Sequence, residues 1–392
     1  EHRLTDHQYT AWAGLTNHDN QFRLSLLDHS IYGGSMGIAM FLGLIYKLTR
    51  KQEYKDAAME TYRFIMSMTE RIGDEELIPS AFNGRGAFIY AGYFLDSVMG
   101  FPEGRETARL LLEAIRNIET EEEKYDRGQD NQAKLEFLNG YAGIVTLCLE
   151  IWESFADESA LHTGRIYGDR LCHLLGQENV ELAGFAHGSS GILYALQKMV
   201  QAKLLPPEND LIRQMLQFEE QHYERSYANW KDLRTHIEEP YSSMYWCHGA
   251  PGVLLGRSGM GSDWLDAEDR RRILDAIVQH ASTNPRVSLC HGVFGIIDIL
   301  LTLREHPDWS EHESEIDAAV WRLANRPDLL SRIEGMKDRG LVSLMLGVSG
   351  VAWACLRMVD PRLPSVLTLQ MPDQSIGTSQ CQEVGHTEEV TL

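Results

Sequence analysis

The sequence predicts an all-α protein, an α/α toroid built from seven helical hairpins. Three observations predict this fold. A glycine motif recurs seven times along the 392 residues, an apolar stretch of helical length follows each copy, and amphipathic stretches with a helical period lie between the copies. The alternation of apolar and polar residues that marks strands is nearly absent.

The repeated motif is a glycine, two variable residues, a second small residue and then an apolar run. The copies are spaced 43 to 61 residues apart, and their leading glycines are Gly34, Gly84, Gly140, Gly188, Gly249, Gly292 and Gly347. Glycine allows a positive φ or a close approach of two backbones. We therefore expect each motif to form the turn that enters an inner helix.

The stretches after the motifs predict an inner layer of helices, with examples at Ile38–Thr49, Ile144–Trp152, Ile192–Val200, Ile296–Leu303 and Val351–Val359. The intervening stretches predict an outer layer, with examples at Tyr54–Thr69, Glu106–Ile118, Asp210–Tyr227, Glu268–Ala281 and Glu313–Ala324. An open solenoid needs polar end caps. The first and last inner stretches are as apolar as the middle ones, which favours a closed ring with all its turns gathered at one end.

Composition sets the limits of the domain and of its partners. We expect one toroid over residues 1–370, a solvated loop at Glu119–Asp130, and a polar, disordered tail over 371–392. The net charge of -21 argues against a general nucleic-acid binder. No apolar run reaches the roughly 18 residues that a membrane span requires. The chain starts at Glu1 rather than Met, so we expect it to be part of something longer.

The six cysteines do not have the density of a disulfide scaffold. Cys148, Cys172 and Cys355 lie in apolar helical stretches and are predicted to be buried thiols. This usage favours a reducing cytoplasmic location.

Only three motif copies place a metal-capable residue directly before the leading glycine. They contribute His187, then Cys247 with His248, then Cys290 with His291. Consecutive hairpins are neighbours in a ring, so these side chains should converge. Two thiolates and one imidazole suit zinc, and three protein ligands leave one position open for a reactant.

We therefore predict one catalytic zinc ion on Cys247, Cys290 and His291. Two alternatives stay open: a closed site with His187 or His248 as fourth ligand, and two buried cysteines without metal. The charge count favours thiol chemistry. Zinc with two thiolates and a neutral imidazole is neutral overall, so a thiolate added to it stays electron-rich and nucleophilic.

A histidine next to such a centre can carry a proton at neutral pH. We predict that His187 is the general acid or base. The alternative is a core histidine that holds a turn. Glu136, four residues before Gly140, is predicted to face the same mouth, the alternative being a solvated surface charge.

These motifs resemble those of the lanthionine synthetase cyclases. The resemblance covers residues 10–370 and rests on Trp246-Cys-His-Gly-Ala-Pro-Gly252, Leu289-Cys-His-Gly292, Gly184-Phe-Ala-His-Gly188 and Ile31-Tyr-Gly-Gly-Ser-Met-Gly-Ile38. The ending, from Leu346-Gly-Val-Ser-Gly-Val351 to Asp360-Pro-Arg-Leu-Pro-Ser-Val-Leu367, is similar to that of the class II, bifunctional lanthipeptide synthetases.

The resemblance implies a lanthipeptide cyclase. In that family a cysteine of a dehydrated precursor peptide binds zinc as thiolate and adds to the β-carbon of dehydroalanine or dehydrobutyrine. The enolate is then protonated at Cα, which gives a thioether ring. Carried over by motif, Cys247, Cys290 and His291 would bind zinc and His187 would handle the proton. We also expect Trp246 and His248 to contact the substrate, and a dehydratase domain or partner to act first.

Two positions depart from the family pattern. Glu136 stands where the family usually has an aspartate, and Ile296 stands where class II members often have asparagine. Two other functions therefore stay open. One is a related enzyme that adds a small thiol such as glutathione to dehydrated residues in proteins, and the other is a degenerate cyclase fold that only binds peptide.

Overall fold

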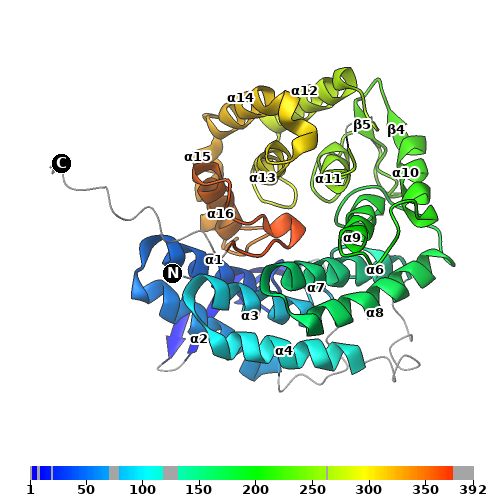
Figure 1. Ribbon diagram of the computed structural model, residues 1–392. Coiled ribbons are helices and arrows are strands. Elements are labelled where there is room, and N and C mark those ends of the chain that lie inside the picture. Colours follow the sequence, from blue (N-terminus) through cyan, green and yellow to red (C-terminus); the bar gives the residue numbers. More distant parts are fainter. Residues whose placement is uncertain are drawn as a thin grey trace.

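A computed structural model describes residues 2–6, 9–18, 21–69, 79–117, 131–261 and 264–373. Its inner layer consists of α1 (Ser35–Thr49), α3 (Arg85–Met99), α7 (Tyr141–Phe155), α9 (Ser189–Gln201), α11 (Ala250–Gly256), α13 (Val293–Arg304) and α16 (Val348–Val359). Its outer layer consists of α2 (Gln52–Thr69), α4 (Pro102–Asn117), α8 (Glu158–Leu175), α10 (Asp210–His222), α12 (Ala267–Thr283), α14 (Glu313–Ala324) and α15 (Leu329–Asp338). Figure 1 shows the two layers as concentric rings.

The inner helices form a closed ring. Each packs against the next one in chain order, and the last, α16, packs against the first, α1. The predicted α/α toroid is therefore confirmed. A short helix α6 (Asn131–Leu135) precedes the third turn, and a 3-10 helix η3 (Pro307–His312) connects α13 to α14.

The glycine motif repeats because the turns are too tight for a side chain. Each leading glycine is the residue that precedes its inner helix. A Cβ on the second glycine would meet the carbonyl oxygen six residues earlier, at 2.2 Å for Gly252 and 1.7 Å for Gly295. Only glycine tolerates this close approach. Gly249 is the one leading glycine with a positive φ, of 89°.

Hydrogen bonds join neighbouring turns around most of the ring. The amide N–H of Ile31 donates to Phe82 O, that of Leu138 to Ala186 O, that of Phe185 to Trp246 O, that of Cys290 to Met345 O, and that of Met345 to Tyr32 O. The second and third turns are joined by the Ser80 hydroxyl, which donates to Leu138 O at 2.8 Å. The turns therefore share one end of the toroid.

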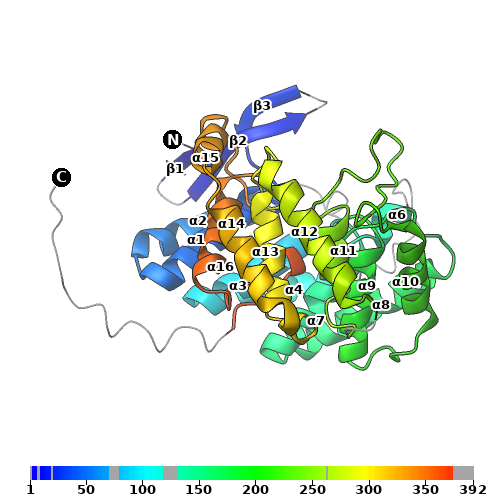
Figure 2. The same ribbon diagram turned by 90° about the horizontal axis from the view of Figure 1, so that it is seen from above.

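A three-stranded antiparallel sheet precedes the first hairpin, and its strands are β1 (Arg3–Asp6), β2 (Tyr9–His18) and β3 (Gln21–Leu26). The N–H of Leu15 donates to Gly340 O, and the Trp12 indole donates to the Thr61 hydroxyl at 2.9 Å. The sheet thus binds both sides of the seam where α16 meets α1 (Figure 2). The expectation of a chain nearly without strands was wrong here. The strand signal was present in β3, where Phe22, Leu24 and Leu26 alternate with polar residues, although all three side chains are exposed. A two-stranded hairpin, β4 (Tyr223–Glu224) with β5 (Asn229–Trp230), follows α10.

The chain after α16 turns into the middle of the ring (Figure 1) and contains the 3-10 helix η4 (Val366–Thr368). The Trp353 indole donates to Pro364 O at 2.9 Å, and Arg357 donates to Leu363 O at 2.9 Å. The Ser365 hydroxyl donates to Asp298 at 2.5 Å. These buried contacts fill the lumen away from the turns.

Three smaller expectations can be placed. The predicted loop at Glu119–Asp130 and the tail from residue 374 onward lie outside the described residues, while Met371 is buried. Cys148 is buried as predicted, whereas Cys172 and Cys355 are half-buried. Among the described helices, none combines the length and the apolar character that crossing a membrane would require.

Candidate metal centre

Cys247, Cys290 and His291 lie together at the mouth of the ring. Cys247 precedes α11, and the other two precede α13, so the set joins neighbouring turns. One ligand atom from each lies within 4.8 Å of the other two, and both cysteines are buried. The Cys290 Sγ and the His291 Nε2 are 3.6 Å apart. Within the described residues, this is the group of three or more such side chains that could hold a metal ion.

The geometry and the donor set fit zinc. Tetrahedral zinc with bonds of about 2.3 Å to sulfur and about 2.0 Å to nitrogen separates the two atoms by about 3.5 Å. The observed 3.6 Å matches this value. Neither His187 nor His248 belongs to the group. Three ligands would leave one position of a tetrahedral ion open.

The electrostatics of the two thiols favour metal binding. A hydrogen bond with Cys290 is the main cause that holds the pKa of Cys247 below its usual range, against the effect of burial. Burial is the main cause that raises the pKa of Cys290, helped by the charge of Cys247. Burial and the charge of one sulfur thus oppose ionisation of the other. A divalent cation would remove this conflict, because it stabilises both thiolates at once.

His187 and Glu136 form a second polar pair at the mouth. The His187 Nδ1 lies 2.8 Å from the Glu136 carboxylate, which also accepts from the Asn139 amide. Asn139 in turn accepts from the Asn83 amide at 2.8 Å. Burial lowers the pKa of His187, but the hydrogen bond and the charge of Glu136 outweigh burial and raise it overall. The pair therefore favours the protonated form of the His187 imidazole.

The structure places His248 behind His187. The two rings are stacked, with centroids 5.6 Å apart, and His248 is only 2% exposed. Burial is the main cause that lowers the pKa of His248, which favours its neutral form. This position differs from the predicted contact with substrate, because the side chain is covered.

The predicted substrate contact of Trp246 needs the same correction. Its indole is 1% exposed and packs against Phe82, Phe137 and Phe185. Trp246 is a core residue beneath the turns. Its place next to Cys247 in the sequence suggested a contact with substrate, but adjacent side chains point in different directions here.

The sequence analysis missed Tyr32 and the pair Asp232–Arg234. The Tyr32 hydroxyl donates to the Cys290 Sγ at 3.0 Å. A signal existed, because Tyr32 stands two residues before its leading glycine, as Cys247 and Cys290 do. The Arg234 guanidinium donates to Asp232 at 2.6 Å and its charge acts on both Cys247 and His187. These two residues lie between motifs, so no repeat position indicated them.

The fold and the cluster at its mouth are those of a known class of proteins. The chain matches the family described as "Lanthionine synthetase C-like protein" over residues 25–370. A match over most of the chain shows that this protein belongs to the lanthionine synthetase C-like family. The resemblance seen in its motifs is thereby confirmed.

Two known proteins are similar to this chain, one in sequence and one in fold. The chain is 25% identical over 200 residues to the lacticin 481/lactococcin biosynthesis protein LcnDR2 of Lactococcus lactis subsp. lactis. That match covers 46% of this chain and only 21% of the relative. The solved structure of nisin cyclase has the same fold, with a TM-score of 0.60 and 16% identity, and the match covers 90% of this chain and 94% of that one.

Proposed function

We propose that this chain is a zinc-dependent lanthipeptide cyclase. It would add cysteine thiolates of a dehydrated precursor peptide to dehydroalanine or dehydrobutyrine and so form lanthionine and methyllanthionine rings. The observation that carries the proposal is the convergence of two chemically distinct groups at one mouth: a Cys-Cys-His cluster and the His187–Glu136 pair.

Cys247, Cys290 and His291 would hold the ion, with the Tyr32 hydroxyl donating to the Cys290 sulfur. When bound, zinc supplies a Lewis acid that keeps the peptide cysteine ionised and anchored at neutral pH. Such anchoring matters more than ionisation. A free thiol of pKa about 8.5 is already a few per cent thiolate at pH 7, whereas positioning can contribute up to about 7–11 kcal/mol.

His187 would supply the proton that ends the addition. The carbon–sulfur bond forms at Cβ, the electron pair of the C=C bond moves toward Cα and its carbonyl, and a proton must reach Cα. Glu136 holds His187 through Nδ1 and raises its pKa, so the imidazolium can donate from Nε2. The longer side chain of Glu136, compared with an aspartate, still reaches this ring.

The substrate would arrive already dehydrated, so the proposal includes a dehydratase domain or partner that acts first. The relative LcnDR2 is much longer than the part this chain matches. Free thiols at Cys148, Cys172, Cys247, Cys290 and Cys355 suit a reducing cytoplasmic location.

The test combines metal analysis with product analysis. Wild type should contain one zinc per chain and convert a dehydrated precursor to thioether rings, detected as loss of thiols that alkylating reagents can label. Cys290→Ala should lose both zinc and ring formation. Full zinc in Cys290→Ala would overturn the ligand assignment.

A second variant separates the two groups. His187→Asn should keep its zinc and slow ring formation by about 10²–10⁴-fold, the usual range for a general acid. Loss of the metal from His187→Asn would instead make His187 a ligand. If zinc-loaded wild type cyclises no dehydrated peptide, the function that remains is peptide binding. Transfer of glutathione to dehydrated proteins would favour the enzyme that adds a small thiol.

A further inference from the structure

A cavity of about 530 Å³ lies beside the metal centre. One wall is the turn that carries two of the candidate ligands, with Val287 and Ser288 directly before Leu289 and Cys290. The opposite wall is α15, with Arg332 and Met336, and Leu346 of the seventh turn closes one end. We call this space the arginine groove. It opens at the same end of the toroid as the cluster, because the sixth and seventh turns both border it.

The arginine groove is positively charged, although the chain carries a net charge of -21. Three arginines line it: Arg286, Arg332 and Arg339. Arg332 binds the carboxylate of Asp328, which Arg326 also binds at 2.7 Å. Within the described residues, neither Arg286 nor Arg339 has a carboxylate partner. Arg339 donates to the Gly335 carbonyl at 2.7 Å, and Arg286 lies over the Tyr245 ring at 5.8 Å.

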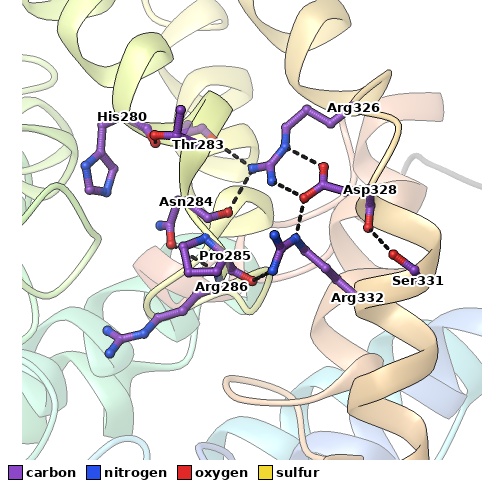
Figure 3. Close-up of polar contacts among 10 residues, drawn as sticks. His280, Thr283, Asn284, Pro285, Arg286, Arg326, Asp328, Ser331 and Arg332 are labelled. Atoms are coloured by element: carbon purple, nitrogen blue, oxygen red, sulfur yellow. Dashed lines mark hydrogen bonds and ion pairs between the residues drawn. The ribbon is translucent and has the colours of Figure 1, made fainter.

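The groove is a built structure rather than a loose surface. Arg332 donates to Pro285 O at 3.0 Å and Arg326 donates to Asn284 O at 3.0 Å, so two arginines tie the α15 region to the turn (Figure 3). The Asn284 side chain accepts from the Arg286 N–H at 2.9 Å and donates to His291 O at 3.4 Å. These bonds fix the groove wall to the backbone of a candidate metal ligand.

Arg286 connects the groove to the cluster itself. It lies on Tyr245, whose ring also packs edge-on against His291 with centroids 5.8 Å apart. Arg286 and Arg339 are exposed, so a ligand could reach both guanidinium groups. A group bound in the groove would therefore lie beside a reactant held at the metal position.

We infer that the arginine groove binds an acidic segment of the peptide substrate, namely aspartate or glutamate side chains a few residues from the reacting cysteine. This inference rests on the proposed function, since it takes the cysteine as anchored at the cluster. Guanidinium groups pair with carboxylates in a planar, two-bond geometry. The apolar side chains of Val287, Met336 and Leu346 suit the remainder of a peptide. The net charge of -21 argues against a nucleic acid as the ligand of the groove.

The test is a binding measurement that needs no turnover. Two fluorescent peptides of the same length carry one cysteine each, flanked by glutamates in one and by glutamines in the other. Anisotropy on the zinc-loaded protein at low salt should show that the glutamate peptide binds wild type about fivefold more tightly, the effect of two partly exposed ion pairs. The preference should shrink as salt is added.

The variant Arg286→Gln/Arg339→Gln should lose this preference. The matched control Arg165→Gln/Arg322→Gln changes the net charge equally at exposed positions on α8 and α14 and should keep it. Zinc content and thermal unfolding are measured on all three proteins, so a misfolded variant is recognised. If the double variant is misfolded, the single variant Arg339→Gln, which is remote from the cluster, should still reduce the preference for the glutamate peptide at least twofold.

Equal affinity of both peptides for wild type would overturn the inference. So would an equal loss of preference in the control variant, because the effect would then reflect overall charge. Failure of the cyclase proposal looks different. If the protein binds the glutamate peptide selectively but forms no thioether in a dehydrated precursor, the inference about the groove stands and the cyclase proposal is rejected.

Discussion

The turns of the ring are joined in two different ways. Around most of the ring a main-chain or hydroxyl hydrogen bond joins each turn to the next, as the Met345 N–H does with Tyr32 O at 3.0 Å. Between the turn of Cys247 and that of Cys290, no such bond is found among the described residues. There the polar contacts run through the thiols: the Cys247 Sγ lies 4.0 Å from Cys290 O and shares a hydrogen bond with the Cys290 side chain.

The difference shows what the metal would do for the fold. The candidate ligands, Cys247 on one side and Cys290 and His291 on the other, span this one junction, so a bound ion would connect the two turns. The Cys247 turn also leaves the Trp246 indole N–H and the His248 Nδ1 buried without a hydrogen-bond partner. Such groups are costly, so this turn is the least satisfied part of the mouth. We expect the junction to depend on metal while the others do not.

Removal of the metal should have the largest effect on the stability of this junction. An ion present at about a thousand times its dissociation constant stabilises the folded state by about 4 kcal/mol. Chelation should lower the unfolding temperature accordingly, as calorimetry can measure. Hydrogen exchange should increase most in residues 243–249 and 286–292, and little in 341–347. An increase spread evenly around the ring would contradict a local role.

The variant Gly295→Ala should have the next largest effect on stability. A Cβ there would lie 1.7 Å from Leu289 O, in the turn that carries two ligands, and we expect a loss of about 3 kcal/mol in unfolding free energy. Gly350→Ala is the matched control, because its Cβ would meet Leu344 O at 1.8 Å in the neighbouring turn. Both should lose stability in denaturant titrations.

Only Gly295→Ala should also weaken zinc binding, since it displaces the residue before Cys290. A competition titration with a chromogenic chelator measures this difference. Equal metal affinity in the two variants would mean that the ligands tolerate movement of their turn.

Ser80→Ala should cost less, about 1–3 kcal/mol. The hydroxyl is buried, links the second turn to Leu138 O, and accepts from the N–H groups of Phe82 and Asn83. Ser67→Ala is the control, because its hydroxyl donates only to Phe64 O within its own helix. Urea unfolding of metal-loaded protein measures both. A loss no larger than that of Ser67→Ala would show that the junction does not need this link.

The sequence alone was sufficient for the ring and for the convergence of its turns. The glycine repeat marks positions, such as Gly252 and Gly295, where any Cβ would clash with the backbone. The helical periods of the stretches between them predicted the two layers. Neighbouring hairpins then bring Cys247 to Cys290 and His291. The sequence did not predict the contacts that depend on the direction of a side chain. Trp246 points into an aromatic core, and Tyr32 crosses from the first turn to Cys290.

The N-terminal sheet was missed for a related reason. In β3 the apolar residues Phe22, Leu24 and Leu26 do alternate with polar ones, but these side chains face solvent rather than the core, and the longer strand β2 shows no such alternation. The groove beside α15 could not be predicted either, because Arg286 and Arg339 are 53 positions apart and meet only through the seventh hairpin.

Glu136→Gln should have the smallest effect on stability, below about 1 kcal/mol, because the His187 partner is partly exposed. Its effect should appear in pH dependence. Glu136 raises the pKa of His187, so the pair contributes stability at low pH that is lost as pH rises through the folded pKa. If His187 donates the proton, the rate of ring formation should fall over the same range.

Removing the carboxylate should move that alkaline limb to lower pH, because burial alone lowers the pKa of His187. Rate–pH profiles of zinc-loaded wild type, Glu136→Gln and the exposed control Glu158→Gln measure the shift. An unchanged limb in Glu136→Gln would assign the titration to another group. If the rate also fell while the limb stayed in place, Glu136 would act only by orienting the His187 ring.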